Sequence, residues 1–218
     1  MKEIGLIFDM DGVIVENHEY HFLAWQKLAN ARGVEVSEEF YKNNMNGRTI
    51  DDLVKVVFDL DVSREEARAI GMEKEEIYRD LYKNHRAVTN GLIPFLKSAK
   101  DQEIPMIVGT SAPEENVIFT LDGLDLRKYF LGVVDDMMVT KGKPDPEVYL
   151  KCAEAIGRKP ENCIVFEDAV SGIKAGKSAG AKVIALATSH KREELEADLI
   201  IDNFEGFTLN DVKSILSK

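Results

Sequence analysis

The sequence predicts an α/β protein: a doubly wound parallel sheet, with a small all-helical domain inserted after the first strand. Short apolar runs of strand length recur along the chain, and segments with helical periodicity separate the later ones, as in βαβ units. The first run breaks this rhythm, because residues 16–87 after it carry helical patterns only. We therefore expect a core domain formed by residues 1–15 and 88–218, and a helical domain formed by residues 16–87.

The predicted strands are continuous apolar runs, which is typical of strands that are buried on both faces of a parallel sheet. They lie at 4–8, 104–109, 131–134, 162–166, 182–186 and 198–201. The segment 145–157 illustrates the helices between the later strands, because its apolar residues recur with helical spacing. Its apolar stripe consists of Val148, Tyr149, Cys152, Ala153 and Ile156. Pro144 and Pro146 suit the start of this helix, and Gly157 suits its end.

The helical domain is predicted to contain three longer amphipathic helices. They span residues 18–33, 49–60 and 63–84. Gly33 is a suitable end for the first, and Ser63 is a suitable N-cap for the third.

Composition and charge exclude several classes of protein. The chain has 28 basic and 39 acidic residues, a net charge of -11, which argues against nucleic acid or an anionic membrane as the main partner. Cys152 and Cys163 form no CxxC pair, so we expect neither a disulfide framework nor a zinc site. No apolar run is long enough to span a membrane, and the N-terminus lacks the layout of a signal peptide. We expect a cytoplasmic protein, and nothing in the sequence requires more than a monomer.

Polar residues follow four of the predicted strands, at the edge where open parallel sheets bind their ligands. They are Asp9 and Asp11, Thr110 and Ser111, Lys143, and Glu167 and Asp168. Clustered carboxylates repel one another unless a cation joins them, and an all-oxygen set suits Mg²⁺. This constellation suits phosphoryl transfer, because an aspartate can form an acyl-phosphate intermediate while a second carboxylate serves as general acid and then base. Thr110 would donate a hydrogen bond to a phosphoryl oxygen, and Lys143 would neutralise developing charge.

Three assignments within this constellation stay open from the sequence alone. Either Thr110 or Ser111 could point its hydroxyl inward, and we favour Thr110. Lys141 competes with Lys143 for the cationic role, although Lys141 is also a natural solvent-exposed side chain. Glu167 could bind the metal or could support its ligands.

The same segments resemble the four motifs of the haloacid dehalogenase (HAD) superfamily, in order and spacing. The matching parts are FDMDGVI at 8–14, the strand that ends in Thr110, the pair Lys143-Pro144, and FEDAVSGIKAGKSAG at 166–180. The resemblance implies a Rossmann-like core with a helical cap after the first strand. It further implies Asp9 as nucleophile and Asp11 as acid/base. It implies Mg²⁺ held by Asp9, the Asp11 backbone carbonyl and Asp168, with Glu167 assisting.

Within the superfamily the chain is similar to the β-phosphoglucomutase-like branch. The matching features are the run EYHF at 19–22 followed by Ala24-Trp25, the pair Gly47-Arg48, and Lys74. The resemblance implies that His21 and Lys74 help to align Asp11 and the substrate, and that Arg48 binds a substrate phosphate. The simpler interpretations are that His21 is an edge-of-core residue and that Arg48 and Lys74 are ordinary surface cations.

One segment departs from the mutase pattern. After Thr110 the chain reads Ser-Ala-Pro-Glu-Glu-Asn (111–116), where mutases have polar and basic residues for a second phosphate. Ala112 and Pro113 cannot donate side-chain hydrogen bonds, and the two glutamates repel an anion. Asn17 also replaces a threonine of the mutase pattern. We therefore predict a phosphatase acting on a small phosphorylated metabolite such as a sugar phosphate, with β-phosphoglucomutase as the alternative.

Two further classes fit the motifs less well. A dehalogenase would not need Asp11, the phosphate-suited Lys143 and the carboxylates for Mg²⁺ together. A non-catalytic binding protein on the same fold would be expected to lack some core motif residues, and all are present here.

Overall fold

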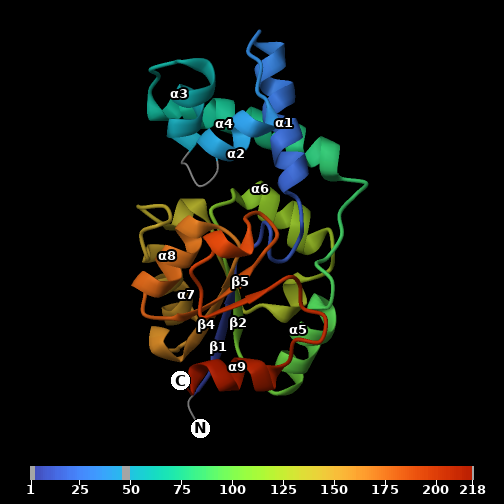
Figure 1. The fold of residues 1–218 in the computed structure, drawn as a ribbon, viewed down its shortest axis with the longest axis vertical. Coiled ribbons are helices and arrows are strands. Elements are labelled where there is room, and N and C mark those ends of the chain that lie inside the picture. Colours follow the sequence, from blue (N-terminus) through green and yellow to red (C-terminus); the bar gives the residue numbers. More distant parts are fainter. Residues whose placement is uncertain (1–2, 46–49, 218) are drawn as a thin grey trace. The chain divides into compact units, whose positions relative to one another are not determined.

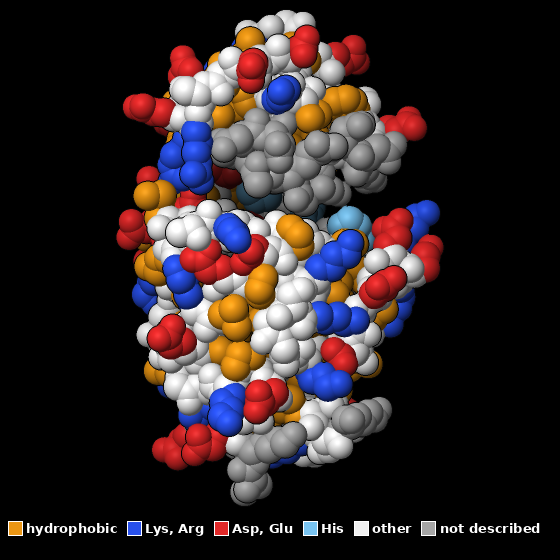
Figure 2. Space-filling view, turned by 90° about the vertical axis from the view of Figure 1, so that its left-hand side faces the viewer, with side chains coloured by type: hydrophobic (Ala, Val, Ile, Leu, Met, Phe, Trp, Pro, Cys, Tyr) orange, Lys and Arg blue, Asp and Glu red, His pale blue; other side chains and the backbone are white. Residues whose placement is uncertain are grey.

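The computed structural model describes residues 3–45 and 50–217 (Figure 1). The chain divides into two compact units: an α/β unit formed by residues 1–16 and 87–218, and a helical unit formed by residues 17–86. In the part of the chain that the structure describes, no helix is long and apolar enough to cross a membrane. On the face shown in Figure 2, acidic and basic side chains are interspersed over the α/β unit, as on an ordinary solvated surface.

The α/β unit is built on a parallel sheet of six strands among the described residues. They are β1 (Gly5–Phe8), β2 (Met106–Gly109), β3 (Val133–Val134), β4 (Cys163–Glu167), β5 (Lys182–Leu186) and β6 (Leu199–Ile201). Their order is β3-β2-β1-β4-β5-β6, and each neighbouring pair is parallel. The order reverses direction at β1, which is the topological switch point of a doubly wound sheet. The predicted α/β architecture is therefore confirmed.

The third strand is shorter than predicted. The apolar run 131–134 contributes only Val133 and Val134, which pair with Val108 and Gly109 of β2. Leu131 is 71% exposed, because β3 lies at the edge of the sheet and the chain before it has no neighbour on one side. The strand predicted at 131–134 is therefore too long, because its first two residues lie outside β3.

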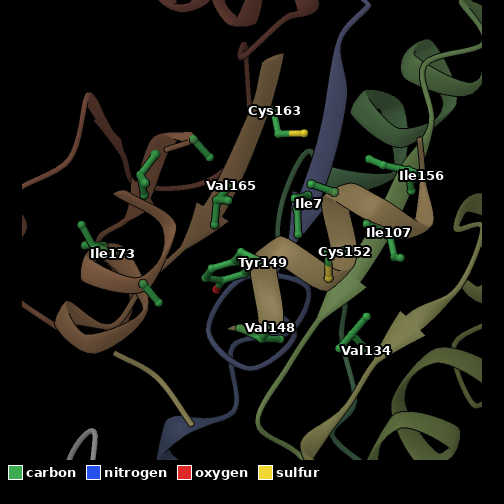
Figure 3. Packing of buried hydrophobic residues seen from close by; sticks show 14 of the residues in the cluster. Ile7, Ile107, Val134, Val148, Tyr149, Cys152, Ile156, Cys163, Val165 and Ile173 are labelled. Carbon is green, nitrogen blue, oxygen red and sulfur yellow. The ribbon is translucent and has the colours of Figure 1, made fainter. Parts of the chain in front are cut away.

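Helices pack on both faces of the sheet (Figure 1). The helices of the α/β unit are α5 (Leu92–Asp101), α6 (Glu114–Val117), α7 (Glu147–Ala155), α8 (Val170–Ser178) and α9 (Leu209–Leu216). Strand side chains alternate between the faces, so Ile7 and Val165 join the core beneath α7 and α8 (Figure 3). Phe8 and Phe166 stack on the opposite face at 4.6 Å, where both contact Phe95 of α5. The sheet is thus buried on both faces, as its continuous apolar strands predict.

Both cysteines lie in this core and give a direct test of the packing. Cys152 and Cys163 are fully buried as free thiols, and burial raises their pKa to about 12 and about 11. Because the thiolate is the reactive species, we expect neither thiol to react with Ellman's reagent near about pH 8 while the protein is folded. Both should react once denaturant is added. Rapid modification of either thiol in the native protein would contradict the described core.

The helical unit contains α1 (His18–Ala31), α2 (Glu38–Asn44), α3 (Ile50–Phe58) and α4 (Arg64–Tyr82). Ser63 caps α4 as predicted, since its hydroxyl accepts from Glu66 N–H at 3.3 Å while the Glu66 carboxylate accepts from Ser63 N–H at 2.9 Å. The first helix ends at Ala31, and Gly33 follows with a positive φ of 75°. Trp25, Leu28 and neighbouring apolar residues form the core of this unit. The predicted pair Gly47-Arg48 lies outside the described residues.

Candidate active site

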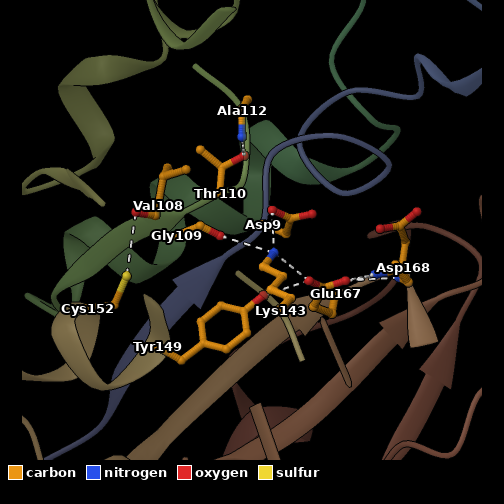
Figure 4. A network of polar contacts seen from close by, with 11 residues as sticks. Asp9, Val108, Gly109, Thr110, Ala112, Lys143, Tyr149, Cys152, Glu167 and Asp168 are labelled. Carbon is orange, nitrogen blue, oxygen red and sulfur yellow. Dashed lines mark hydrogen bonds and ion pairs between the residues drawn. The ribbon is translucent and has the colours of Figure 1, made fainter. Parts of the chain in front are cut away.

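The carboxyl ends of neighbouring strands bring predicted site residues to one edge of the sheet (Figure 4). These are Asp9 after β1, Thr110 after β2, and Glu167 and Asp168 at the end of β4. β1 pairs in parallel with both other strands, and Phe8 is level with Val108 on one side and with Phe166 on the other. The three strands therefore end within one residue of the same level, so the polar residues at their ends lie close together.

Asp9, Glu167 and Asp168 form a buried carboxylate cluster. One oxygen from each lies within 4.8 Å of the others, and the three residues are at most 8% exposed. Two ligands of a single Mg²⁺ lie at most about 4.2 Å apart, so small side-chain adjustments would suffice for some of these oxygens to bind one ion. The donor set, oxygen only and strongly anionic, fits a hard divalent cation.

Lys143 supplies positive charge to two carboxylates of the cluster. Its ammonium donates to Asp9 Oδ1 at 2.9 Å and to Glu167 Oε1 at 2.7 Å, from the loop between β3 and α7. Burial alone would lower the pKa of Lys143, but the charges of Asp9 and Glu167 outweigh it and raise that pKa above its usual value. Lys143 therefore stays charged. Lys141, its competitor in the sequence, is exposed and pairs with Asp145 at 3.6 Å.

Glu167 has hydrogen-bond donors on both carboxylate oxygens. Oε1 accepts from Lys143 and from the Tyr149 hydroxyl at 2.6 Å, and Oε2 accepts the backbone N–H groups of Asp168 and Ala169 at 2.8 and 2.9 Å. Four donors use the four in-plane lone-pair positions of a carboxylate. Although the oxygens are close enough to share an ion with Asp9 and Asp168, this geometry suits Glu167 for holding Lys143 in place.

The protonation of Asp9 follows from its surroundings. Burial raises the pKa of the Asp9 carboxyl well above its usual range, and the charges of Glu167, Asp168 and Asp11 act in the same direction. Lys143 opposes this shift. A divalent cation bound to the cluster would oppose it further, because positive charge favours the ionised carboxylate.

Thr110 and Ser111 differ in exposure. Thr110 is 2% exposed and its hydroxyl oxygen accepts the backbone N–H of Ala112 at 3.1 Å, so its own proton can be donated elsewhere. Ser111 is exposed. The geometry therefore favours Thr110 as the inward-facing hydroxyl.

Asp11 lies in the turn that follows β1. It is partly exposed, and the next residue, Gly12, has a φ of 77° and donates its N–H to Val15 O at 2.7 Å. This left-handed backbone favours glycine, and the turn keeps Asp11 near enough for its charge to contribute to raising the pKa of Asp9.

Several residues that the sequence did not single out complete the site. Tyr149 was predicted only as part of an apolar stripe, yet its hydroxyl binds Glu167. Gly172 lies against the same carboxylate, because a Cβ at this position would be 1.7 Å from Glu167 Oε1. Thr188 and Ser189 follow β5 and donate to the carbonyls of Gly12 and Asp168. The strand-end rule, applied to residues 182–186, would have pointed to these two.

The helical unit places its predicted residues in a buried polar cluster. Lys74 is only 3% exposed, so the interpretation of Lys74 as an ordinary surface cation is wrong. Its ammonium lies 2.5 Å from His21 Nδ1 and 2.9 Å from Glu75 Oε1. The His21 ring stacks on Tyr78 at 3.9 Å, and the Tyr78 hydroxyl lies 2.6 Å from the Asn17 side-chain amide. His21 and Lys74 thus contact each other, and Arg48 lies outside the described residues.

Comparison with known proteins assigns the chain to a family. A family model of haloacid dehalogenase-like hydrolases matches residues 5–180, a range that includes Asp9, Thr110, Lys143 and Asp168. The chain belongs to this family. It is 33% identical over 183 residues to a phosphorylated carbohydrates phosphatase of Thermotoga maritima, with 83% of each chain covered.

Two further similarities extend over nearly the whole chain. The β-phosphoglucomutase of Bacillus subtilis is 28% identical over 214 residues, which are 94% of this chain and 92% of that one. A solved HAD hydrolase of family IA, variant 3, from Entamoeba histolytica has a TM-score of 0.92 at 29% identity, covering 99% of this chain and 100% of that one. The predicted resemblance to the β-phosphoglucomutase-like branch of the HAD superfamily is therefore confirmed.

Proposed function

We propose that this HAD-family enzyme is a Mg²⁺-dependent phosphatase that hydrolyses a small phosphorylated metabolite such as a sugar phosphate. The observation that carries the proposal is the pairing of buried Asp9 with the Lys143 ammonium at 2.9 Å, beside a hydroxyl donor and a second aspartate. This arrangement joins a nucleophile to the positive charge that an anionic phosphoryl group requires. Similarity to a phosphatase of phosphorylated carbohydrates supports the substrate class.

Mg²⁺ would be held by Asp9, Asp168 and the backbone carbonyl of Asp11. Glu167 would support these ligands, because its oxygens already accept hydrogen bonds from Lys143, Tyr149 and two backbone N–H groups. When bound, the ion would reduce the repulsion between the Asp9 carboxylate and the phosphate.

Asp9 would act as the covalent nucleophile, and Asp11 would carry out the proton transfers. A carboxylate oxygen of Asp9 would attack phosphorus, and the leaving alkoxide would take a proton from Asp11. In the second step Asp11 would accept a proton from water as the water attacks the aspartyl phosphate, which releases inorganic phosphate and restores Asp9. Splitting the reaction in this way replaces one difficult displacement by two easier ones.

The remaining groups would bind and orient the substrate. The Thr110 hydroxyl, with Ser111 after it, would donate to phosphoryl oxygens, and Lys143 would balance the charge that develops during transfer. In the helical unit we propose that His21 and Arg48 contact the substrate. Lys74 would act through His21, since its buried ammonium already lies against His21 and Glu75.

A phosphatase is favoured over a mutase by the segment after Thr110. Pro113 is buried and ends the loop, and Glu114 and Glu115 are exposed in the first turn of α6. A bisphosphate would have to place its second phosphate near cationic or neutral donors, and these two carboxylates repel it instead. β-Phosphoglucomutase remains a second candidate, because similarity to the Bacillus subtilis mutase covers nearly the whole of both chains.

One assay separates the two candidates. The purified protein is given Mg²⁺ and a panel of sugar monophosphates that includes β-glucose 1-phosphate, and both free phosphate and glucose 6-phosphate are followed. The mutase reaction is tested with and without a priming glucose bisphosphate. We expect free phosphate from one or several monophosphates. Glucose 6-phosphate with little free phosphate would establish the mutase instead, and neither product from any substrate would overturn both proposals.

A further inference from the structure

A fifth strand of the sheet, β5, also sends polar side chains to the candidate site. Its residues pair with β4, and Ala185 is level with Glu167, so the two strands end close together. Thr188 and Ser189 follow β5 within three residues of its end. Their hydroxyls donate to backbone carbonyls in two different loops of the site.

Thr188 fixes the turn after β1. Its Oγ1 donates to the carbonyl of Gly12 at 2.6 Å, and the N–H of Gly12 donates to Val15 O at 2.7 Å. The peptide groups on both sides of Gly12 are therefore held. Because a peptide is planar, holding the N–H of Gly12 also sets the direction of the Asp11 carbonyl.

Ser189 fixes the loop after β4 in the same way. Its Oγ donates to the carbonyl of Asp168 at 2.9 Å, while the N–H at the other side of this peptide, from Ala169, donates to Glu167 Oε2 at 2.9 Å. The peptide after Asp168 is thus held at both its polar atoms. This leaves little freedom for the main chain that carries the Asp168 carboxylate.

We propose that Thr188 and Ser189 are positioning residues that set the spacing of the metal ligands. Two adjacent residues of one loop hold the Asp11–Gly12 turn and the Asp168 loop. The distance between these two ligand-bearing segments therefore depends on the position of this loop. The inference rests on the proposed function only in taking Asp9, the Asp11 carbonyl and Asp168 as the ligands of Mg²⁺. It predicts that removing either hydroxyl weakens metal binding.

The test measures metal binding directly, in protein without substrate. Mn²⁺ serves as the probe, since it suits the same oxygen ligands and its free form is quantified by electron paramagnetic resonance. Mg²⁺ is then added as competitor. Thr188→Val and Ser189→Ala each remove one hydroxyl, and Thr188→Ser and Ser189→Thr keep it. Groups that support metal ligands typically contribute about tenfold to a hundredfold in affinity, and we expect a loss of at least about tenfold for each removal.

A matched control separates positioning from general stability. Thr208→Val removes a hydroxyl that donates to Asp211 Oδ2 at 2.7 Å at the start of α9, and its cost to helix capping should lower Tm. We expect this variant to lower Tm while leaving Mn²⁺ affinity unchanged. The hydroxyl-keeping variants should restore affinity at both positions.

The outcomes distinguish this inference from the proposed function. Wild-type affinity in folded Thr188→Val and Ser189→Ala would overturn the inference while leaving the phosphatase proposal intact. The same loss in Thr208→Val as in the two site variants would also overturn it, because stability alone would then explain the effect. A wild-type protein that binds no Mn²⁺ or Mg²⁺ and releases no phosphate would overturn the proposed function, and this inference with it.

Discussion

Replacement of Asp9 by asparagine is expected to abolish turnover, with kcat lowered by at least about four orders of magnitude, the scale of losing an enzyme's nucleophile. An amide of the same shape cannot supply the anionic oxygen that attacks phosphorus. The hydrogen bond from Lys143 at 2.9 Å can pass to the amide oxygen, so the geometry around the site should persist. The measurement is steady-state phosphate release on the best substrate of the panel, backed by a single-turnover experiment.

The stability of the same variant gives an independent check. Among the described residues, wild type buries three clustered carboxylates, two of which pair with the ammonium of Lys143. Removing one negative charge relieves repulsion, so in a chelator Asp9→Asn should unfold at the same temperature as wild type or higher. Mg²⁺ should raise Tm less in the variant, because one ligand has been weakened. Asp61→Asn, at a side chain that is 97% exposed, is the matched control and should change neither activity nor the response to Mg²⁺.

Retained turnover in Asp9→Asn would show that Asp9 is not the nucleophile. A collapse of Tm in the chelator would show that Asp9 is needed for folding, and loss of activity would then say nothing about its chemical role.

The sheet and the backbone positions of the site could be predicted because parallel pairing is a simple constraint. Once residues 4–8, 104–109 and 162–166 are predicted as neighbouring strands, Asp9, Thr110 and Asp168 must emerge at one edge. Lys143 is a harder case, since it comes from a loop whose path the strands do not set. It was predicted because it follows the apolar run 131–134 and because its positive charge suits the carboxylates, and the motif resemblance supports the same residue.

Side-chain partners that cross between elements could not be predicted. Periodicity places Tyr149 on the apolar stripe of α7, and it cannot show that the hydroxyl at the end of the ring reaches Glu167 at 2.6 Å. The pKa of the Tyr149 phenol is raised well above its usual range by burial and by the charge of Glu167, so it stays protonated as a donor. Lys74 shows the same limit, because a lysine in a charged helical run is usually exposed and only tertiary packing buries it against His21.

At Gly172 we expect the helix-propensity rule to predict the wrong sign for the change in stability on substitution by alanine. Alanine in place of glycine inside a helix normally stabilises by up to about 1 kcal/mol. In α8, however, the new Cβ would lie 1.7 Å from Glu167 Oε1 and 2.0 Å from Cδ, so the carboxylate would have to move. It would then lose hydrogen bonds from Lys143, Tyr149 and two backbone N–H groups while it stays buried. Breaking a buried ion pair in this way typically costs about 3–5 kcal/mol.

We therefore expect Gly172→Ala to lower the free energy of unfolding by several kcal/mol, about the cost of breaking a buried pair, and to reduce kcat at least about a hundredfold. The loss of activity follows because Lys143 would no longer be held between Glu167 and Asp9. Urea unfolding and phosphate release measure the two effects. Gly132→Ala is the control, because its Cβ would meet only Ile107 Cδ1, at 4.0 Å.

A double-mutant cycle isolates the cause. Glu167→Ala removes the carboxylate that the new methyl group would strike, so adding Gly172→Ala to it should cost nothing further and could recover the ordinary helix gain. The two single changes would then be strongly non-additive, in stability and in turnover alike. If the penalty of Gly172→Ala persists in full in the Glu167→Ala background, the clash lies elsewhere. Glycine would then be required for a reason other than the space that Glu167 occupies. That result would contradict the prediction that Gly172 affects turnover by positioning Glu167 and, through it, Lys143 and Asp9.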